Sequence, residues 1–421
     1  MERIRNWAGN YTYGTTDLHV PESMEQVQKL IVDSSRIKVL GTRHSFNGIA
    51  DSNDRLLSLE KLNRVIELDR KQSRVTVEAG IRCGDLAAYL HANGYALHNL
   101  ASLPHITVVG ACATATHGSG DRNANLAAAV HALEIVKANG EIVVISRDDG
   151  TGRIDGAAVG LGALGVVTKL TLDIIPDFQV SQHVYENLPL ASLEDHFDEI
   201  FSSGYSVSLF TQWKDSRFHQ VWQKRKHEND ALPTAESDFY GAKPSSVRLH
   251  PLPNMPADNC SEQLGIPGPS HERLPHFRMA FTPSAGEELQ SEYFVAREDA
   301  YAALRALDRI SESISPHLYV SEVRTIAQDR LWLSPCYMRE SVGIHFTWKP
   351  NWEAVRHVLP LIERQLAPFG ARPHWGKLFT MSPSQVQALY EKLPDFRSMM
   401  LSFDPDGKFR NTFLNDFIVN G

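Results

Sequence analysis

The fold is decided by the stretch Val39-Leu40-Gly41-Thr42-Arg43-His44-Ser45-Phe46-Asn47. An apolar run at 37–40 is typical of a buried strand, and Gly41 ends it in a turn that carries a histidine and small polar residues. Such turns bring backbone N–H groups close to an anion, because glycine permits close approach and serine or threonine can also donate. The pattern therefore predicts an anion-binding loop. On spacing alone, His44 is a candidate ligand, acid or base, or covalent attachment point.

Composition narrows the class of protein. The chain has 421 residues, a length that favours two domains over one core. Its hydrophobic content of 42% and charged content of 22% are typical of soluble globular proteins. The formal net charge of −8, without a dense Lys/Arg run, argues against a nucleic-acid partner. The N-terminus has no apolar segment of signal-peptide length and no long apolar run follows, so we expect a cytoplasmic enzyme without a membrane span.

Cysteine and histidine spacing predicts no metal site. The four cysteines lie far apart, and we expect reduced thiols: Cys83, Cys112, Cys260 and Cys336. A Pro- and His-rich loop region is predicted at 233–283. Its His271 and His276 have no carboxylate or cysteine partner at metal spacing, so we interpret both as surface or packing residues.

The first part of the chain alternates strands and helices. Ser23 is a predicted N-cap of a helix that ends at Val32, and a second helix runs from Gly84 to the glycine C-cap signal at Asn93-Gly94. Short strands are predicted at 56–59, 65–68 and 75–79. Asn139-Gly140 predicts a hairpin between strands at 133–138 and 142–145.

Two glycine-containing segments are candidates for contact with a cofactor. The residues at 99–120 are nearly all small, which favours either a second loop that contacts phosphate and ring, or a tightly packed helix or loop beside a sheet. Gly160-Leu161-Gly162-Ala163-Leu164-Gly165 has the G-x-G-x-x-G form. A Rossmann fingerprint needs a strand before it and a helix after it, whereas 166–175 is strand-like and 153–159 is a poor strand. We therefore reject the Rossmann interpretation and expect another close approach of backbone to ligand or sheet.

A composition change at Pro176 predicts a second domain. Its helices are predicted at 193–201, 299–313 and 352–366, and its strands at 205–213, 317–325 and 342–348. Two of these strands carry polar pairs at i and i+2, which share a sheet face: Glu322 with Arg324, and His345 with Thr347. The pairs are either the solvated face of an antiparallel sheet or one wall of a cleft for a hydroxylated substrate. Lys377, after a turn beside a tryptophan, is a further candidate.

The combination of motifs is more specific than any one of them. Its members are Asn6-Trp7, Gly41-x-x-His44-Ser45-Phe46, Ser102-Leu103-Pro104-His105, Thr116-His117-Gly118-Ser119-Gly120, Glu322-x-Arg324, His374-Trp375-Gly376-Lys377 and Asp404-Pro405-x-Gly407-x-Phe409-x-Asn411. Over essentially the whole chain they resemble the vanillyl-alcohol-oxidase (FAD-linked, PCMH-type) superfamily, and within it the alditol (xylitol) oxidases.

The resemblance implies an α+β, two-domain vanillyl-alcohol-oxidase-type fold. An FAD-binding domain with two small α/β subdomains is expected beside an α/β substrate (cap) domain with an antiparallel sheet. The implied boundaries are 1–176 for the N-terminal part of the FAD domain, 177–372 for the cap domain and 373–421 for the part that returns to the FAD domain.

The resemblance also implies the site residues. His44 would be bonded covalently to the flavin 8α-methyl group, as a single bond, because no cysteine lies where doubly attached relatives have one. The residues expected at FAD are Gly41, Thr42, Arg43, His44, Ser45, Ser102, Thr107, Gly110, Thr114, Ala115, Thr116, His117, Val166 and His374. Those expected at the polyol are Ser102, Glu322, Arg324, Thr347 and Lys377. Thr42-Arg43 departs from relatives with small residues there, and Arg43 is left as a pyrophosphate contact or a solvent-facing side chain.

The implied reaction is FAD-dependent oxidation of the terminal hydroxyl of alditols such as xylitol and sorbitol to the aldehyde, with O2 reduced to H2O2. Lys377 is expected to accept the hydroxyl proton, with His345 as an alternative, while Arg324 stabilises the developing alkoxide. One rival is an aldonolactone or sugar-alcohol dehydrogenase that uses another electron acceptor. Another is a non-catalytic carbohydrate- or flavin-binding protein. We expect a monomer whose partners are the polyol and O2.

Overall fold

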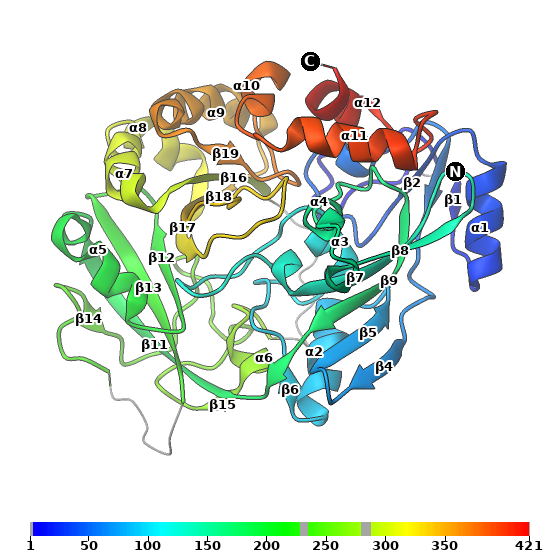
Figure 1. The fold of residues 1–421 in the computed structure, drawn as a ribbon. Coiled ribbons are helices and arrows are strands. Elements are labelled where there is room, and N and C mark those ends of the chain that lie inside the picture. Colours follow the sequence, from blue (N-terminus) through cyan, green and yellow to red (C-terminus); the bar gives the residue numbers. More distant parts are fainter. Residues whose placement is uncertain (1–2, 228–234, 279–287, 421) are drawn as a thin grey trace.

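Figure 1 shows the computed structural model of the chain, which describes residues 3–227, 235–278 and 288–420. The fold is α+β, as the sequence predicts, with a five-stranded and a nine-stranded sheet as its largest parts. The predicted loop region at 233–283 lies partly outside the described residues, at 233–234 and 279–283.

The N-terminal part is built on small sheets. A parallel sheet has the order β1-β3-β2, an antiparallel sheet has the order β4-β5-β9-β7-β8, and β6 pairs with β10. The strands are β1 Leu18–His19, β2 Ile37–Val39, β3 Arg55–Leu57, β4 Val65–Asp69, β5 Arg74–Glu78, β6 Tyr95–Ala96, β7 Val130–Val136, β8 Ile142–Ser146, β9 Val166–Asp173 and β10 Ile175–Pro176. The three predicted short strands are confirmed to within two residues.

Local signals in this part are confirmed. The backbone N–H of Gln26 donates to the Ser23 hydroxyl at the start of α1, Met24–Asp33. Gly94 adopts a φ of +81° just after α2, Cys83–Ala92. Asn139-Gly140 turns the chain between β7 and β8, and Gly140 has the positive φ (+84°) that such a turn requires.

The larger sheet has nine strands, in the order β14-β11-β13-β12-β17-β18-β16-β19 with β15 paired to β11. Its strands are β11 Gln179–Pro189, β12 Ser206–Thr211, β13 Arg217–Lys226, β14 Lys243–Pro244, β15 Gly268–Pro269, β16 Leu289–Ala296, β17 Leu318–Ile326, β18 Ser341–Trp348 and β19 Arg372–Pro373. The predictions match β12, β17 and β18. The long strands β11, β13 and β16 are additional.

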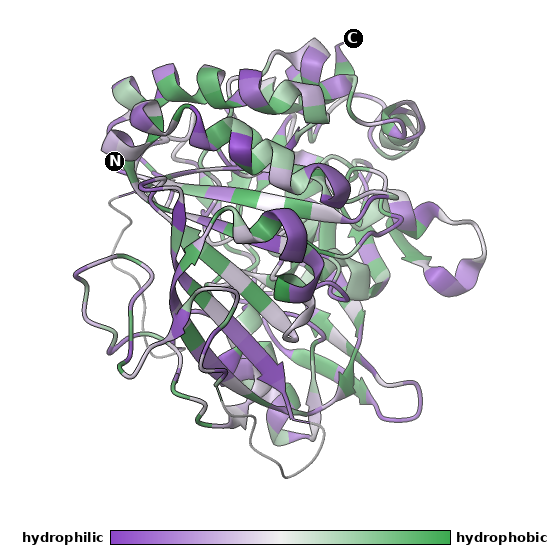
Figure 2. Cartoon of the chain, turned by 90° about the vertical axis from the view of Figure 1, so that its left-hand side faces the viewer, coloured by the Kyte–Doolittle hydropathy of each residue, from purple (hydrophilic) through white to green (hydrophobic). Residues whose placement is uncertain are grey.

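The two faces of this sheet have different neighbours. Helices α5 Ser192–Ser202, α7 Ala300–Asp308 and α9 Trp352–Leu366 pack their apolar side chains on one face, against alternate residues of the strands such as Val323 and Ile344. The intervening residues, including Glu322 and His345, face the other way. Figure 2 shows the resulting alternation of hydrophilic and hydrophobic bands along the strands.

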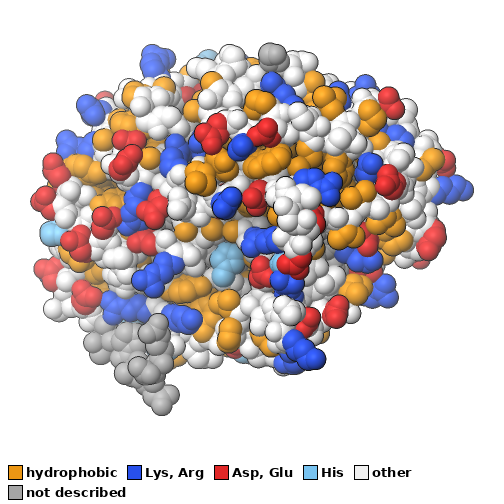
Figure 3. Space-filling model, in the orientation of Figure 1, with side chains coloured by type: hydrophobic (Ala, Val, Ile, Leu, Met, Phe, Trp, Pro, Cys, Tyr) orange, Lys and Arg blue, Asp and Glu red, His pale blue; other side chains and the backbone are white. Residues whose placement is uncertain are grey.

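The C-terminal helices return toward the N-terminal part (Figure 1). Phe409 packs with Val27 and Ile31 of α1, and α11 contacts α4. The remaining helices are α3 Val108–Ala113, α4 Arg153–Ala157, α6 Ser270–Arg273, α8 Ser311–Ile314, α10 Pro383–Gln387, α11 Leu393–Phe403 and α12 Thr412–Leu414. Across the described ranges, no helix has the length and apolar character needed to cross a membrane. Side chains of both charges are interspersed on the face that Figure 3 shows.

Two asparagine side chains tie the distant parts of the chain together. The amide of Asn47 donates to the carbonyls of Trp375 and Lys377, each at 2.9 Å. The amide of Asn411 donates to three carbonyls at 48–51. The loop after β2 and the segment that carries Lys377 are therefore fixed to each other by the Asn47 amide and by the Phe46 N–H, which donates to the Gly376 carbonyl at 2.7 Å.

We expect Asn47→Ala to lower the free energy of unfolding by about 1–3 kcal/mol, because it leaves two carbonyls without their donor. Calorimetric or denaturant unfolding measures the change. The control is Asn63→Ala, at an exposed residue whose amide bonds a local carbonyl, and it should shift stability by less than about 0.5 kcal/mol. Equal shifts in both variants would contradict the role of Asn47.

Candidate active site

A single cavity of about 960 Å³ joins the two sets of predicted site residues. The predicted cofactor residues that line it are Gly41, Thr42, Arg43, His44, Ser45, Ser102, Thr107, Gly110, Thr114, Thr116, His117 and His374. The predicted substrate and catalytic residues Glu322, Arg324, His345, Thr347 and Lys377 also line it. The structure therefore places the residues predicted for the cofactor and for the substrate around one continuous space.

Two of the predicted FAD residues lie outside the cavity lining. Ala115 and Val166 are not among the lining residues; they are 1% and 0% exposed and lie in apolar cores. Val166 is the first residue of β9, and because side chains alternate along a strand it is Val167 that faces the cavity. Ala115 has a φ of +55°, which turns its side chain into the core beside α3.

The two predicted anion loops touch at Thr107. A Cβ on Gly41 would lie 2.9 Å from the Thr107 hydroxyl oxygen, and one on Gly110 would lie 2.7 Å from it. Gly41 is thus needed where the two loops pack together, and Gly110 is needed for packing beside Thr107 within its own segment. Residues 109–114 of the second segment line the cavity, which agrees with the small-residue pattern in the sequence.

The glycine segment at 160–165 also borders the cavity, and the rejection of a Rossmann motif is confirmed. Helix α4 precedes the segment and strand β9 follows it, the reverse of the Rossmann order. The buried Lys38, which the sequence analysis did not single out, donates to the Gly162 carbonyl at 3.0 Å. Burial lowers the pKa of Lys38 to about 7, although Asp404 opposes the shift.

His44 is held as a neutral ring. It stacks on Trp7 with 4.9 Å between ring centroids and an angle of 17°, and its Nδ1 lies 3.1 Å from the Thr42 carbonyl. Burial lowers the pKa of His44 to about 4. The ring therefore keeps a nitrogen lone pair at neutral pH. Arg43 beside it has an exposed side chain that reaches the Arg5 carbonyl at 3.5 Å.

The polar wall of the cavity is formed by β17 and β18. Glu322 is paired with His345 in the sheet register, and Arg324 with Gly343. Glu322, Arg324, His345 and Thr347 are all between 5% and 8% exposed, which excludes the solvated-face interpretation. Gly343 makes room for the wall, since a Cβ there would lie 3.2 Å from Glu292 Oε1.

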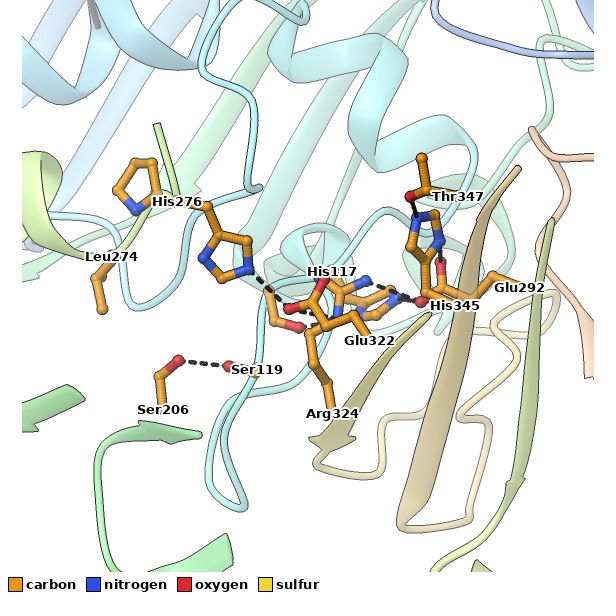
Figure 4. Close-up of polar contacts among 12 residues, drawn as sticks. His117, Ser119, Ser206, Leu274, His276, Glu292, Glu322, Arg324, His345 and Thr347 are labelled. Atoms are coloured by element: carbon orange, nitrogen blue, oxygen red, sulfur yellow. Dashed lines mark hydrogen bonds and ion pairs between the residues drawn. The ribbon is translucent and has the colours of Figure 1, made fainter. Parts of the chain in front are cut away.

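Glu292 connects the wall to the rest of the site (Figure 4). Its Oε1 accepts from Arg324 Nη2 at 2.8 Å and lies 3.1 Å from His117 Nε2. Its Oε2 accepts from Lys377 Nζ at 2.6 Å. This carboxylate is fully buried, and it is the shared partner of two cations and a histidine that come from separate parts of the chain.

The charged side chains in this group shift one another's pKa values. Burial alone would raise the pKa of Glu292, but Lys377, His117 and Arg324 outweigh it and hold the pKa well below its usual value. Burial lowers the pKa of Lys377, and Arg324 adds to the effect while Glu292 opposes it. Burial, together with Lys377, lowers the pKa of His345 to about 4. The carboxylate is thus anionic and His345 is neutral at physiological pH.

Hydrogen bonds fix the tautomer of His345. Lys377 Nζ donates to His345 Nδ1 at 2.8 Å, so the hydrogen of the neutral ring is on Nε2, which is 3.0 Å from the Thr347 hydroxyl (Figure 4). Lys377 therefore contacts both the anion at 292 and an imidazole lone pair, an arrangement suited to proton exchange.

Sequence reasoning missed Glu292 and misplaced His276. Glu292 lies on β16, whose Tyr293-Phe294-Val295 has β propensity, and a lone glutamate inside such a run is the signal that was available. His276 is neither a surface residue nor only a packing residue. It is 6% exposed, lines the cavity and contacts Glu322 Oε1 at 2.7 Å. The partner is 46 residues away, which no spacing rule covers.

The residues present fit a bound FAD. The cavity volume is in the range of small-molecule and cofactor sites. Backbone-rich loops at 41–46, 107–116 and 160–165 border the part that contains His44. In residues 3–227, 235–278 and 288–420, no cluster of three or more His, Cys, Asp and Glu side chains could hold a metal ion. The four cysteines are free and buried.

Comparisons with known proteins agree with this geometry. Residues 18–146 match the FAD binding domain family, and residues 284–417 match the D-arabinono-1,4-lactone oxidase family. The chain is 48% identical to an alditol oxidase from Streptomyces sp. over 99% of both chains. The chain belongs to the alditol oxidase family. This family membership places it among the FAD-linked oxidases.

Other relatives of this alditol oxidase family member are more distant. An L-gulonolactone oxidase from Mus musculus is 26% identical, with 98% of this chain and 97% of that one covered. An L-gulono-1,4-lactone dehydrogenase from Mycobacterium tuberculosis is 27% identical over the same shares. Among solved structures, a cholesterol oxidase from B. sterolicum has a TM-score of 0.80 at 14% identity, covering 99% of this chain and 96% of that one. That likeness confirms the fold.

We expect Glu292→Gln to lower the free energy of unfolding by about 3–5 kcal/mol, because it leaves Lys377 and Arg324 buried without their shared anion. Denaturant or thermal unfolding measures the loss. Glu298→Gln is the matched control, since Glu298 is exposed and follows the same strand; it should change stability by less than about 0.5 kcal/mol. A Glu292→Gln variant as stable as this control would show that the buried anion is dispensable.

Proposed function

We propose that this protein oxidises the terminal primary hydroxyl of alditols such as xylitol and sorbitol to the aldehyde, with FAD as cofactor and O2 reduced to H2O2. The observation that carries the proposal is one cavity in which a neutral His44 and a buried Lys377–Glu292–Arg324 group share the lining. The 48% identity to an alditol oxidase supports the substrate class.

Bound FAD supplies the redox chemistry, as acceptor of the hydride and donor of electrons to O2. The chain supplies position and proton transfer. An alcohol is a poor hydride donor until its hydroxyl proton leaves, and Lys377 is the proposed acceptor of that proton. Its 2.8 Å contact with His345 Nδ1 lets the two side chains share the proton. Arg324 places a permanent positive charge where the alkoxide develops.

The remaining polar groups orient the substrate. Glu322, Ser102 and Thr347 line the same cavity and are proposed to bind the other hydroxyls. Because the wall is 5–8% exposed, a bound polyol exchanges water for fixed partners. This explains why a polyol, rather than a simple alcohol, would make full use of the site.

His44 is proposed to bond covalently to the flavin 8α carbon. In such a bond a His44 ring nitrogen would replace one methyl hydrogen, and the two hydrogens released, one from the methyl group and one from the ring N–H, would reduce O2 to H2O2. The neutral ring, with a pKa of about 4, has the lone pair that this attack needs. Burial raises the pKa of the cavity-lining Cys112, which disfavours a second, thiolate attachment.

The sheets support the first of the proposed domain boundaries, because β10 ends at Pro176 and β11 opens the nine-stranded sheet at Gln179. The second proposed boundary, between 372 and 373, falls inside β19, where Pro373 still pairs with Tyr293 of the large sheet. We also infer a cytoplasmic monomer whose partners are the polyol and O2.

A lactone substrate is the second candidate. The match to the D-arabinono-1,4-lactone oxidase family spans 284–417, which contains Glu292, Glu322, Arg324, His345 and Lys377. Anaerobic addition of xylitol and of L-gulono-1,4-lactone to separate samples of the yellow protein distinguishes the two. Bleaching by xylitol, followed by H2O2 formation in air, supports the alditol proposal. Bleaching by the lactone alone would favour the lactone as substrate in place of the alditol. A spectrum that neither compound changes would contradict both proposed activities.

We expect Lys377→Met to slow flavin reduction by xylitol on the order of 10²- to 10⁴-fold while FAD stays bound, because the proton acceptor is lost. In the wild type the rate should rise with pH as Lys377 deprotonates, below the ordinary lysine range because its pKa is lowered. Stopped-flow absorbance measures both effects. Lys349→Met, at an exposed lysine just after β18, is the control. Near-normal reduction by Lys377→Met would remove this residue from the chemistry.

We expect wild-type protein to stay yellow after acid precipitation, and His44→Ala to release its flavin under the same treatment. The reason is that only a covalent bond survives unfolding. Absorbance of the pellet and the supernatant measures the fraction retained. Complete release from the wild type would rule out covalent attachment. His19→Ala, at a partly exposed histidine of β1, is the control and should retain the flavin.

A further inference from the structure

A second buried lysine lies beside the polar wall, and the proposed reaction does not use it. Lys224 is 1% exposed and lies on β13, two strands away from Glu322 in the order β13-β12-β17. The sheet register places Lys224 opposite Ser206, and Glu322 opposite Phe210, so Lys224 and Glu322 share the cavity-side face.

The surroundings of Lys224 match an ammonium group. Its Nζ donates to the carbonyls of Leu274 and Pro275, and it lies 3.3 Å from His276 Nδ1. An ammonium has three hydrogens and no lone pair, and three acceptors surround it here. Burial lowers the pKa of Lys224 to about 7, while Glu322 favours its charged form. The third hydrogen therefore goes to His276 Nδ1 at neutral or lower pH.

This contact fixes which nitrogen of His276 carries the hydrogen. With Nδ1 as acceptor, the hydrogen of the neutral ring is on Nε2, which donates to Glu322 Oε1 at 2.7 Å (Figure 4). Trp222 and Phe210 meet the ring edge-on, at centroid distances of 5.3 and 5.6 Å, and hold its plane. Oε1 is thereby occupied, and Glu322 retains Oε2 as the acceptor that a ligand in the cavity would use.

The arrangement repeats the one at the catalytic lysine. Lys377 contacts His345 Nδ1, and His345 Nε2 contacts the Thr347 hydroxyl. Lys224 contacts His276 Nδ1, and His276 Nε2 contacts the Glu322 carboxylate. Each lysine fixes the tautomer of a histidine. The Nε2 of each histidine in turn contacts a residue that is proposed to bind substrate hydroxyls.

We propose that Lys224 and His276 are positioning residues that fix Glu322 for recognition of a polyol chain and so set the preference for polyols over monohydric alcohols. This inference rests on the proposed alditol oxidation. Neither residue touches the reacting carbon in this role, so their loss should weaken polyol recognition and leave the chemical step intact.

The test uses flavin-loaded enzyme and anaerobic flavin reduction below pH 7, with xylitol and with 1-pentanol, a five-carbon alcohol with one hydroxyl. The variants are His276→Leu, which removes the donor, His276→Gln, whose amide can replace the Nε2–H donor, and Lys224→Met. His276→Leu should raise the half-saturating xylitol concentration about tenfold to a hundredfold, since one hydrogen bond to a charged group is lost. The limiting rate should change less than about twofold.

The pattern across variants separates positioning from folding. His276→Gln should recover most of the xylitol affinity, Lys224→Met should shift it in the same direction as His276→Leu, and none should alter the reaction with 1-pentanol. Equal losses for both alcohols, or no recovery with glutamine, would overturn the positioning role. A wild-type flavin that xylitol leaves oxidised would overturn the proposed function, and this inference with it; a reactive wild type with unchanged variants would overturn the inference alone.

Discussion

A single buried carboxylate, that of Glu292, holds the site together. A buried charge costs free energy unless a partner of opposite charge or a hydrogen bond compensates it. Lys377, Arg324 and His117 supply that compensation for Glu292, so the carboxylate fixes their positions as much as any substrate does. The same constraint works in reverse, because two cations this close repel unless an anion lies between them. The low dielectric of the buried wall strengthens each of these interactions.

The nine-stranded sheet places Glu292 and its neighbours on one face that borders the cavity. Helices α5, α7 and α9 cover its apolar face. Because side chains alternate along a strand, the polar residues between the apolar ones all lie on the opposite face. Neighbouring strands then bring Glu292, His345 and Glu322 into one row, through the register of β16, β18 and β17. Sheet pairing positions Glu322, His345 and Glu292, whereas Lys377 and Ser102 come from loops.

The sequence was informative where the signal is local. The glycine turn before His44, the Asn139-Gly140 hairpin and the i, i+2 pairs on β17 and β18 follow from backbone preference and period, which need only neighbouring residues. Glu292 was missed, and His276 was interpreted as a surface or packing residue, because the partners of both lie far away in the chain. The resemblance implied Val166, whereas its neighbour Val167 lines the cavity, because adjacent side chains of a strand point to opposite faces.

Family resemblance and physical pattern contributed different things. The residues themselves argued for an anion loop, against a Rossmann motif and for a polar sheet face. The resemblance added FAD, the alditol and the proposal that His44 bonds covalently to the flavin. The cavity then joined both sets of residues, which neither source alone could have placed in one space.

The asparagine ties have a consequence for the order of folding. Asn411 contacts carbonyls at 48–51, more than 350 residues earlier, and Asn47 contacts the backbone that carries Lys377. Contacts this distant in sequence form late, because the intervening chain has to be closed first. The part of the cavity around His44 is therefore completed in a late step of folding, after both ends of the described chain have come together.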